Sequence, residues 1–118
     1  MVQRQLRIAE SAAEVDAAEA LWLSNAASLE RIGPTFGPWP GAFLAKLRRD
    51  LAFSTMLCVR AVDRLVAALG AHGMMDDTPV QRAFRDVHGV ANHGANNWDV
   101  QAVPYAREVL GLPPLPRH

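Results

Sequence analysis

The chain has 118 residues, of which half are hydrophobic and 7% aromatic, and its twelve basic and twelve acidic side chains cancel. A chain of this length forms one domain, so residues 1–118 are expected to fold as a single unit. The balanced charge, with no basic run carrying interleaved aromatic residues, argues against nucleic-acid binding. No segment has the roughly 18 uninterrupted apolar residues of a membrane span, and the N-terminus lacks a signal-peptide pattern, so we expect a soluble, cytoplasmic protein.

The first predicted helix covers about residues 3–31. Apolar or small side chains recur there at intervals of three and four residues, which places them on one helix face for about six turns. These positions are Ile8, Ala12, Val15, Ala18, Trp22, Ala26 and Leu29. The helix is expected to stop at residues 32–41, where three glycines and three prolines cannot continue it.

A second helix is predicted over residues 41–69, with the same spacing of apolar side chains and an end at Gly70, interpreted as a left-handed cap. Two long helices joined by a short connection pack antiparallel. The small residues Ala52, Ser54 and Ala61 suggest a close approach of backbones, although ordinary core packing explains them equally well. Cys58, the single cysteine, is interpreted as a small apolar residue within this helix, and it excludes an internal disulfide.

Two shorter helices complete the predicted fold. Residues 70–77 read as a glycine-bearing loop, and Thr78, Pro79 and Gln81 form a capping-box pattern that starts a helix over residues 79–93. A last helix is expected near residues 99–110, with Pro104 weakening its first turn, followed by an extended tail. The sequence therefore predicts an all-α, antiparallel four-helix bundle, whose two long apolar stripes leave surface for a homo-oligomer or partner chain.

Residues 85–99, RDVHGVANHGANNWD, place two histidines, three asparagines and two aspartates within fifteen positions. On a helix, Arg82, Asp86, Val90 and His93 share one stripe, whereas His88 points roughly 140° away from His93. The two histidines therefore lack the spacing of a metal pair, and no metal site is expected.

His93 lies at the predicted end of its helix, where unpaired carbonyl groups favour a protonated imidazole by roughly 0.3 to 1 kcal/mol. Such a ring can hydrogen-bond an anionic or developing charge. Gly89, inside the helix, is typical of a close approach by another backbone or a flat ligand, and Phe84 and Trp98 could wall an apolar pocket. The alternative is that the histidines and asparagines only satisfy helix-end carbonyls and one another.

The stretches RLVAALGAHGMMDDTPVQRAFRDVHGVANHGANNWD and REVLGLPP resemble the C-terminal helical domain of two-component flavin-dependent monooxygenases of the acyl-CoA dehydrogenase superfamily, such as hydroxyphenylacetate and steroid-ring hydroxylases. RIAESAAEVDAAEALW is similar to the first helix of that domain, so the resemblance covers nearly the whole chain. It implies a four-helix bundle at the core of a homotetramer that closes one side of a flavin site. The complete enzymes are longer, with an N-terminal helical domain and a middle β domain that supply most flavin contacts.

The resemblance also implies roles for particular residues. His93 falls where the family places a histidine over the flavin and substrate, helping to orient a phenolic substrate and the flavin-bound oxygen that hydroxylates it. The resemblance also implies supporting positions around the site and a loop that reaches toward the flavin of a neighbouring subunit. The supporting positions are His88, Asn92, Asn96, Asn97 and Asp99, and the loop is Gly70, Ala71, His72 and Gly73.

Cofactor, partners and alternatives follow from the same resemblance. It implies reduced flavin, FMN or FAD, no metal, and a flavin reductase or a separate flavin-domain chain as partner. Acyl-CoA dehydrogenases that place their base here have a glutamate followed by glycine, whereas this chain has His93 and Gly94, which disfavours α-proton abstraction. A non-catalytic assembly module and a truncated relic without activity of its own remain as alternatives, and the isolated chain is expected to be inactive.

Overall fold

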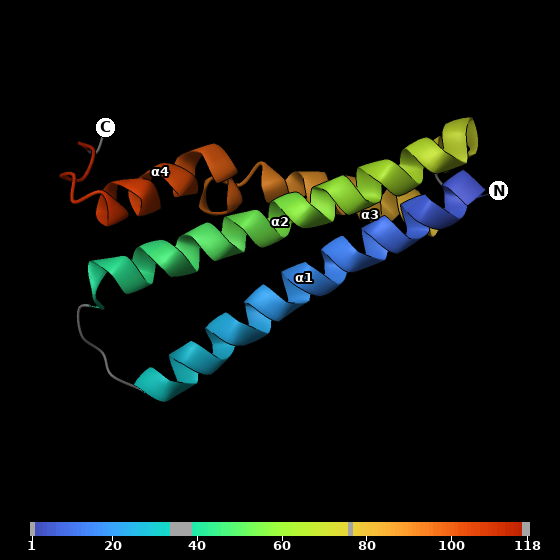
Figure 1. Ribbon diagram of the computed structural model, residues 1–118. Helices are drawn as coiled ribbons and strands as arrows, with labels where there is room; N and C mark the ends of the chain where they lie inside the picture. The colour runs from blue at the N-terminus through green and yellow to red at the C-terminus, as the bar shows by residue number, and fades with distance from the viewer. Residues whose placement is uncertain (1, 34–38, 76, 117–118) are drawn as a thin grey trace.

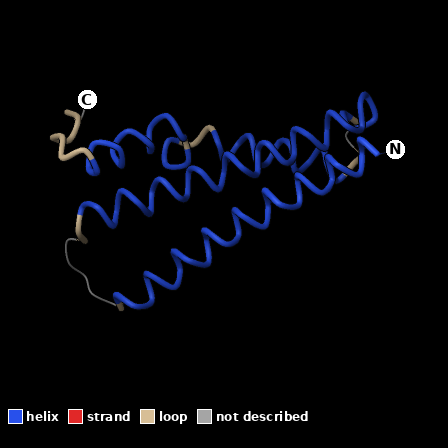
Figure 2. The backbone as a smooth tube through the Cα atoms, in the orientation of Figure 1, coloured by secondary structure: helices blue, strands red, loops and turns tan. Residues whose placement is uncertain are grey.

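The computed structural model describes residues 2–33, 39–75 and 77–116. Four α-helices follow one another, with two short 3-10 helices between them and no strand in these ranges (Figure 2). Their bounds are α1 Val2–Ile32, α2 Gly41–Leu69, η1 Gly70–Met74, α3 Pro79–Ala91, η2 Gly94–Asn96 and α4 Trp98–Val109. The predicted all-α fold is confirmed. None of the helices described is both long and apolar enough to cross a membrane.

Helix α2 is the central element of the molecule (Figure 1). Helix α1 runs antiparallel to it on one side, as predicted, and α3 and α4 follow one another along the other side. In the described ranges the backbone of α1 lies close to α2 alone, and α3 and α4 do not approach each other. The other three α-helices are therefore arranged around α2 rather than around one enclosed core, and the molecule is elongated, with extents of 50 × 33 × 25 Å.

Small residues bring α1 and α2 together. Ser11 Oγ donates a hydrogen bond to the carbonyl oxygen of Ala61 at 3.0 Å, and Ser54 Oγ donates to that of Ala18 at 3.4 Å. All four residues are buried. A side-chain hydroxyl on one helix can reach a backbone carbonyl on the other only where little side-chain volume separates the helices. The close approach suggested by Ser54 and Ala61 is therefore confirmed.

Charged side chains flank this contact. The Arg64 guanidinium pairs with Glu10 at 3.1 Å and with Glu14, and it donates to Ser11 Oγ at 3.1 Å. Both glutamates lie one helical turn apart on α1, so a single arginine of α2 holds two successive turns of α1.

The predicted helix bounds are correct to within two residues. Helix α3 ends at Ala91 rather than residue 93, because the chain turns into an extended conformation at His93. Helix α4 begins at Trp98, one residue early, and it continues through Pro104, which lies in its interior rather than its first turn.

The segment after α2 differs from the predicted loop. Gly70 has the expected positive φ of 61°, but its ψ of −145° lies outside the left-handed helical region, so it is not the predicted left-handed cap. The chain then forms η1 instead of an open loop. Gly73 is buried there, and an added Cβ would meet Leu69 Cβ at 3.0 Å and the Val66 carbonyl at 3.1 Å. Residues 34–38 of the predicted break at residues 32–41, and Asp76 of the predicted loop, lie outside the described residues.

Half of the predicted capping box at the start of α3 forms. Thr78 Oγ1 accepts from the Gln81 N–H at 3.3 Å and donates to the Met75 carbonyl at 2.9 Å. The Gln81 side chain does not return the bond, since Thr78 N–H donates to the Met75 carbonyl and Gln81 Oε1 is buried without a partner among the described residues. The threonine hydroxyl is therefore the group that fixes this helix start.

Replacing Thr78 with alanine is expected to lower the free energy of unfolding by about 1 kcal/mol, because the Gln81 N–H loses its acceptor. Urea denaturation followed by circular dichroism measures the change. Thr78→Ser keeps the hydroxyl and should stay close to the wild-type value, and a serine variant as unstable as the alanine variant would assign the effect to the lost methyl group instead.

The C-terminal segment turns away from α4 at Gly111, which has a φ of 67°. The Leu112 N–H donates to the Arg107 carbonyl and the Gly111 N–H to the Glu108 carbonyl, the pair of bonds that ends many helices at a glycine. Residues 112–116 have no regular structure, as predicted for the tail, and Arg107 Nε donates to the Pro113 carbonyl at 2.7 Å. The last two residues of the predicted tail lie outside the described residues.

Candidate functional site

His93 stands at the junction between α3 and α4. Asn92 caps the end of α3 through its backbone N–H, and His93 follows with an extended backbone, φ −72° and ψ 131°. Its ring Nδ1 accepts a hydrogen bond from the Ala95 N–H at 3.3 Å, so the side chain caps the start of η2. The histidine is thus held by the helix that follows it and not by the helix before it.

The ring of His93 therefore meets a backbone N–H at the start of η2 and not the carbonyl groups at the end of α3, where it was expected. Because Nδ1 accepts a backbone N–H, that nitrogen carries no proton, and the neutral ring has its N–H at Nε2. Nε2 makes no hydrogen bond to any other described residue. His93 therefore presents one oriented donor.

An open groove of about 800 Å³ adjoins this ring. It is lined by Leu51, Arg85, Asp86, Gly89, Val90, His93, Ala95 and Asn96. Its volume is within the range of small-molecule sites, but it is open on one side and forms a wall rather than a closed pocket. Asp86, Val90 and His93 of the predicted stripe lie in it, whereas Arg82 does not.

His88 belongs to a different cluster. Its Nε2 lies 2.7 Å from Asp63 Oδ1 on α2, and its ring packs on Phe84 with centroids 4.5 Å apart. The pair joins α3 to α2 and does not line the His93 groove. The predicted divergence of the two histidines is therefore seen, and His88 does not lie in the groove with His93.

The three asparagines and Asp99 do not all lie at the groove. Asn97 Oδ1 accepts from the Val100 N–H at 3.3 Å and so caps α4. Asn96 lines the groove, whereas Asn92 and Asp99 are exposed outside it. The interpretation that these side chains satisfy helix-end carbonyls is wrong for His93 and Asn97, because both accept N–H groups at helix starts.

The glycine-bearing segment lies away from His93. Gly70, Ala71 and His72 are exposed at the C-terminal end of α2, and Gly73 is buried against it. No residue of this segment lines the groove with His93. Of all the predicted site residues, the structure brings only His93 and Asn96 together in one groove.

Gly89 is one of the residues that line the groove. A Cβ added there would meet no described atom within 4 Å, so the expected close approach by another backbone of this chain is absent from the described residues. The open space beside Gly89 is compatible with the other interpretation of this glycine, that a flat ligand lies against it. Phe84 and Trp98 do not share a wall, because Trp98 packs on Phe53 instead, with centroids 5.6 Å apart.

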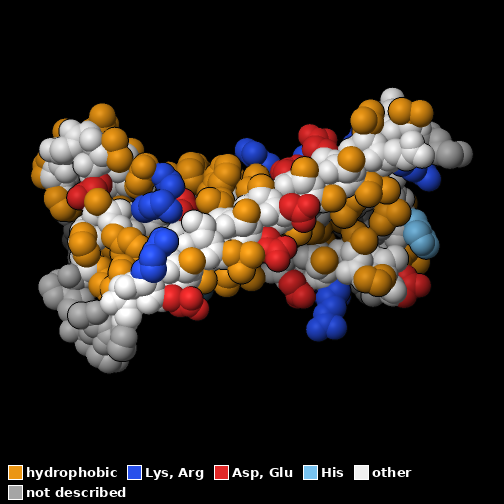
Figure 3. All heavy atoms as spheres, turned by 60° about the horizontal axis from the view of Figure 1, so that its bottom comes forward, with side chains coloured by type: hydrophobic (Ala, Val, Ile, Leu, Met, Phe, Trp, Pro, Cys, Tyr) orange, Lys and Arg blue, Asp and Glu red, His pale blue; other side chains and the backbone are white. Residues whose placement is uncertain are grey.

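A second, apolar groove lies between α1, α2 and α3. Its volume is about 630 Å³, and it shares Asp86 and Val90 with the His93 groove. Hydrophobic side chains cover much of this side of the molecule, interrupted by scattered charged groups (Figure 3). Cys58 lines this groove half-buried, and burial raises the pKa of its thiol, in keeping with an inert apolar residue.

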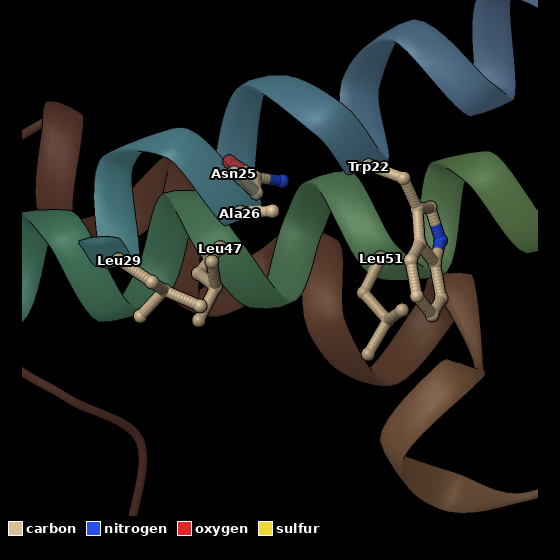
Figure 4. A pocket seen from close by; sticks show the side chains of 6 residues that line it. All are labelled: Trp22, Asn25, Ala26, Leu29, Leu47 and Leu51. Atoms are coloured by element: carbon tan, nitrogen blue, oxygen red, sulfur yellow. The ribbon is translucent and has the colours of Figure 1, made fainter.

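The same surface continues between α1 and α2 as a smaller pocket of about 240 Å³. Trp22 and Leu51 lie at one end of it and Leu29 and Leu47 at the other (Figure 4). Trp22 is 61% exposed although it lies on the predicted apolar stripe. The uncovered apolar surface expected from the sequence is therefore present.

Asp50 forms a buried polar cluster that sequence reasoning missed. Its carboxylate is 2% exposed and accepts from Lys46 Nζ at 2.7 Å and from Arg49 Nη2 at 2.6 Å. Burial alone would raise the pKa of Asp50, but the hydrogen bonds and charges of Lys46 and Arg49 outweigh it and hold the pKa below its ordinary value. Lys46 also reaches Asn25 of α1, and the Arg49 guanidinium lies 4.0 Å from the Tyr105 ring centroid of α4.

No group of three or more histidine, cysteine or carboxylate side chains in the described part of the chain converges as metal ligands do. The donors that the His93 groove offers are instead those that hold organic molecules, an imidazole N–H, a guanidinium and an amide.

The sequence matches the family described as acyl-CoA dehydrogenase, C-terminal domain, over residues 2–98. The oxygenase component of p-hydroxyphenylacetate 3-hydroxylase from Acinetobacter baumannii is 40% identical over 112 residues, which are 94% of this chain and 26% of the relative. The oxygenase component of FADH(2)-dependent resorcinol hydroxylase from Rhizobium sp. (strain MTP-10005) is 35% identical over 114 residues, 93% of this chain and 28% of the relative.

Solved structures show the same fold. The HsaA monooxygenase from M. tuberculosis superposes with a TM-score of 0.84 at 30% identity, over 96% of this chain and 30% of that chain. The 3-HSA hydroxylase from Rhodococcus sp. RHA1 gives 0.83 at 29% identity, over 95% of this chain and 29% of that chain. The chain thus spans between 26% and 30% of the length of these relatives.

Proposed function

Because this chain belongs to the acyl-CoA dehydrogenase C-terminal domain family and matches the C-terminal part of flavin-dependent oxygenase components, we propose that it is the C-terminal domain of a reduced-flavin-dependent monooxygenase that hydroxylates a phenolic substrate. The observation that carries the proposal is the open groove in which His93 presents a single oriented N–H. An open wall of this kind suits a domain that closes one side of a site whose other walls come from elsewhere.

The groove fits a flat aromatic group. Gly89 leaves open space in it, Leu51 and Val90 supply apolar walls, and Asn96 adds an amide at the rim. When bound, reduced flavin supplies the activation of oxygen and its transfer to the substrate ring. The residues of this chain would position the substrate and exclude water from it.

The proposed role of His93 is to donate its Nε2 proton to an oxygen of the phenol or of the cofactor. The Ala95 N–H fixes the ring through Nδ1, so the donor is oriented before a ligand arrives. Asn96 would act beside it in the groove, and His88, Asn92, Asn97 and Asp99 would support the local backbone. The exposed residues Gly70–His72 of η1, just after α2, would contact flavin in a neighbouring subunit together with Gly73.

Assembly is part of the proposal. Trp22 and the apolar grooves beside it leave a surface of the kind that interfaces cover. We propose a homo-oligomer, a tetramer by analogy with the family, or a complex with a separate flavin-domain chain, together with a flavin reductase that supplies the reduced cofactor. The Acinetobacter and Rhizobium relatives are oxygenase components, as their names state.

The test joins this chain to the flavin-binding domains of a relative. In a chimera with the N-terminal part of the Acinetobacter p-hydroxyphenylacetate hydroxylase oxygenase component, His93→Ala should lower product formed from p-hydroxyphenylacetate by about tenfold, because one oriented donor is lost. Flavin binding, measured by fluorescence, should change little. Arg82→Gln, on the same helix but outside the groove, serves as the control. Unchanged hydroxylation in His93→Ala would remove this residue from the mechanism.

A second candidate function is a non-catalytic assembly module. The exposure of Trp22 in an apolar surface favours it, since that surface needs a partner whether or not His93 takes part in chemistry. Saturable micromolar binding of reduced flavin by the isolated chain would contradict this candidate.

A further inference from the structure

The apolar stripes of α1 and α2 border one long surface that the chain leaves open. The groove between α1, α2 and α3 and the smaller pocket between α1 and α2 share Trp22, so they form one continuous apolar valley. On α2 the valley follows a single helix face at intervals of three and four residues. The residues of this face are Leu47, Leu51, Ser54, Cys58 and Val62.

The arrangement of the helices explains why the valley is open. Helices α1 and α2 run the length of the molecule, whereas α3 and α4 follow one another along α2 (Figure 1). The backbone of α1 lies close to α2 alone, so in the described ranges no helix other than α2 packs against both α1 and α3. A helix seated in the valley gives α1 a second neighbour, as in a complete four-helix bundle.

The valley has the length of a helix of about four turns. Leu47 and Val62 mark its ends on α2, and the continuous helix between them spans about 22 Å at 1.5 Å per residue. On α1 the valley runs from Val15 to Leu29, over nearly the same length. The end between Leu29 and Leu47 is seen in Figure 4.

The floor of the valley suits apolar side chains better than a small polar ligand. Ser54 Oγ donates to the Asp50 carbonyl at 2.8 Å, and Thr55 Oγ1 donates to the Leu51 carbonyl at 3.0 Å, so both hydroxyl protons are already used. Small-molecule sites orient their ligands with a few converging polar groups. An amphipathic helix needs only the apolar surface, because it binds such a groove through side chains spaced by three and four residues.

The charged side chains at the valley are acidic. Glu19 of α1 and Asp86 of α3 line it from two different helices, and no described lysine or arginine does. Asp86 has only a weak contact of 3.8 Å with the exposed Arg82, and Glu19 makes no ion pair within the described residues. A partner helix with basic side chains beside its apolar stripe therefore meets carboxylates of α1 and of α3.

The same charges disfavour a second copy of this chain as the occupant. Helices α1 and α4 expose the most apolar side chains, but α1 carries three basic and five acidic side chains and α4 carries one basic and two acidic. Either helix would bring further carboxylates toward Glu19 and Asp86. The chain spans 26% of the Acinetobacter relative, so most of a protein of that kind lies outside it and can supply the partner.

We propose that the apolar valley binds one helix of a separate protein chain, about four turns long, whose apolar stripe is flanked by lysine or arginine. This inference rests on the assembly part of the proposed function and selects a separate chain over a second copy for this surface. The apolar side chains of the partner helix cover Trp22 and the stripe of α2, and its basic side chains pair with Glu19 and Asp86.

The test uses two synthetic helical peptides of about 18 residues with the same leucine stripe, one flanked by lysine and the other by glutamate. Each is titrated into the 118-residue chain, and a shift of tryptophan fluorescence to shorter wavelength, lost in Trp22→Phe, reports that this ring is covered. The lysine peptide should bind about tenfold more tightly than the glutamate peptide. Glu19→Gln combined with Asp86→Asn should bring the two affinities together.

Asp16→Asn combined with Glu30→Gln is the matched control, because it removes two exposed charges of α1 outside the valley. Equal binding of the two peptides, or a lysine preference that falls as much in this control, would overturn the proposal. So would a dimer of the free chain, found by sedimentation, in which Trp22 is already covered by a second copy. His93 lies outside the valley, so its hydroxylation test in the chimera fails or succeeds independently of these results.

Discussion

Asp50→Asn is expected to lower the free energy of unfolding by about 2 to 3 kcal/mol, measured by urea denaturation at neutral pH. The carboxylate is buried and receives charged hydrogen bonds from Lys46 and Arg49, and removing one member of a buried ion cluster leaves its partners uncompensated. The two cations are 46% and 27% exposed, so water recovers part of the loss. The estimate therefore lies below the range for fully buried pairs.

The effect of Asp50 depends on pH in a defined direction. The folded-state pKa of Asp50 lies below its ordinary value of 3.8, so its contribution to stability is complete above that value and disappears as the pH falls through the folded-state pKa. Asparagine resembles the protonated acid. The difference between wild type and Asp50→Asn should therefore be constant near neutral pH and shrink on acidification below 3.8.

Asp16→Asn is the control, because Asp16 is exposed on α1 and makes no ion pair within the described residues. It should change stability by less than about 0.5 kcal/mol. A stability difference for Asp50→Asn that does not shrink in acid would show that the variant perturbs packing and not the charged cluster.

Ala61→Leu is expected to destabilise the protein by about 3 kcal/mol, also by urea denaturation. Ala61 is 1% exposed, and its carbonyl accepts the hydroxyl of Ser11 from α1. A leucine side chain cannot enter this contact unless α1 moves away, which breaks that bond and opens the contact at Ala18 and Ser54. The expected cost lies at the upper end of the usual range for overpacking because a whole helix must shift.

Ala67→Leu provides the matched control, since Ala67 lies on α2 with an exposed side chain. It should leave stability nearly unchanged. A loss for Ala61→Leu no larger than for Ala67→Leu would mean that α1 can shift at little cost.

The sequence predicts the helices well because their signals are local. Apolar spacing defined α1 and α2, and the hydroxyl of Thr78 defined the start of α3. The ends of α3 and α4 shifted because the side chains of His93 and Asn97 cap the helices after them, which periodicity does not reveal. Gly73 could not be recognised as a packing residue, because its neighbours Leu69 and Val66 meet it only after the chain turns.

Interactions that depend on how the helices pack are the features that the sequence does not predict. Asp50 with Lys46 four residues earlier reads as an ordinary exposed helix pair, and only the positions of α1 and α4 make it buried. For the candidate site, the stripe through Asp86, Val90 and His93 pointed to the groove correctly.

The central position of α2 determines how the domain can come apart. Since the backbone of α1 lies close to α2 alone, α1 can detach while α3 and α4 keep their backbone contacts with α2, whereas without α2 no two of the remaining α-helices have backbones that lie close together in the described ranges. Release of α1 is therefore an opening that leaves the rest of the fold in place. A partner that clamps Trp22 of α1 to Leu51 of α2 would stabilise the domain against this opening, so assembly and folding become thermodynamically linked.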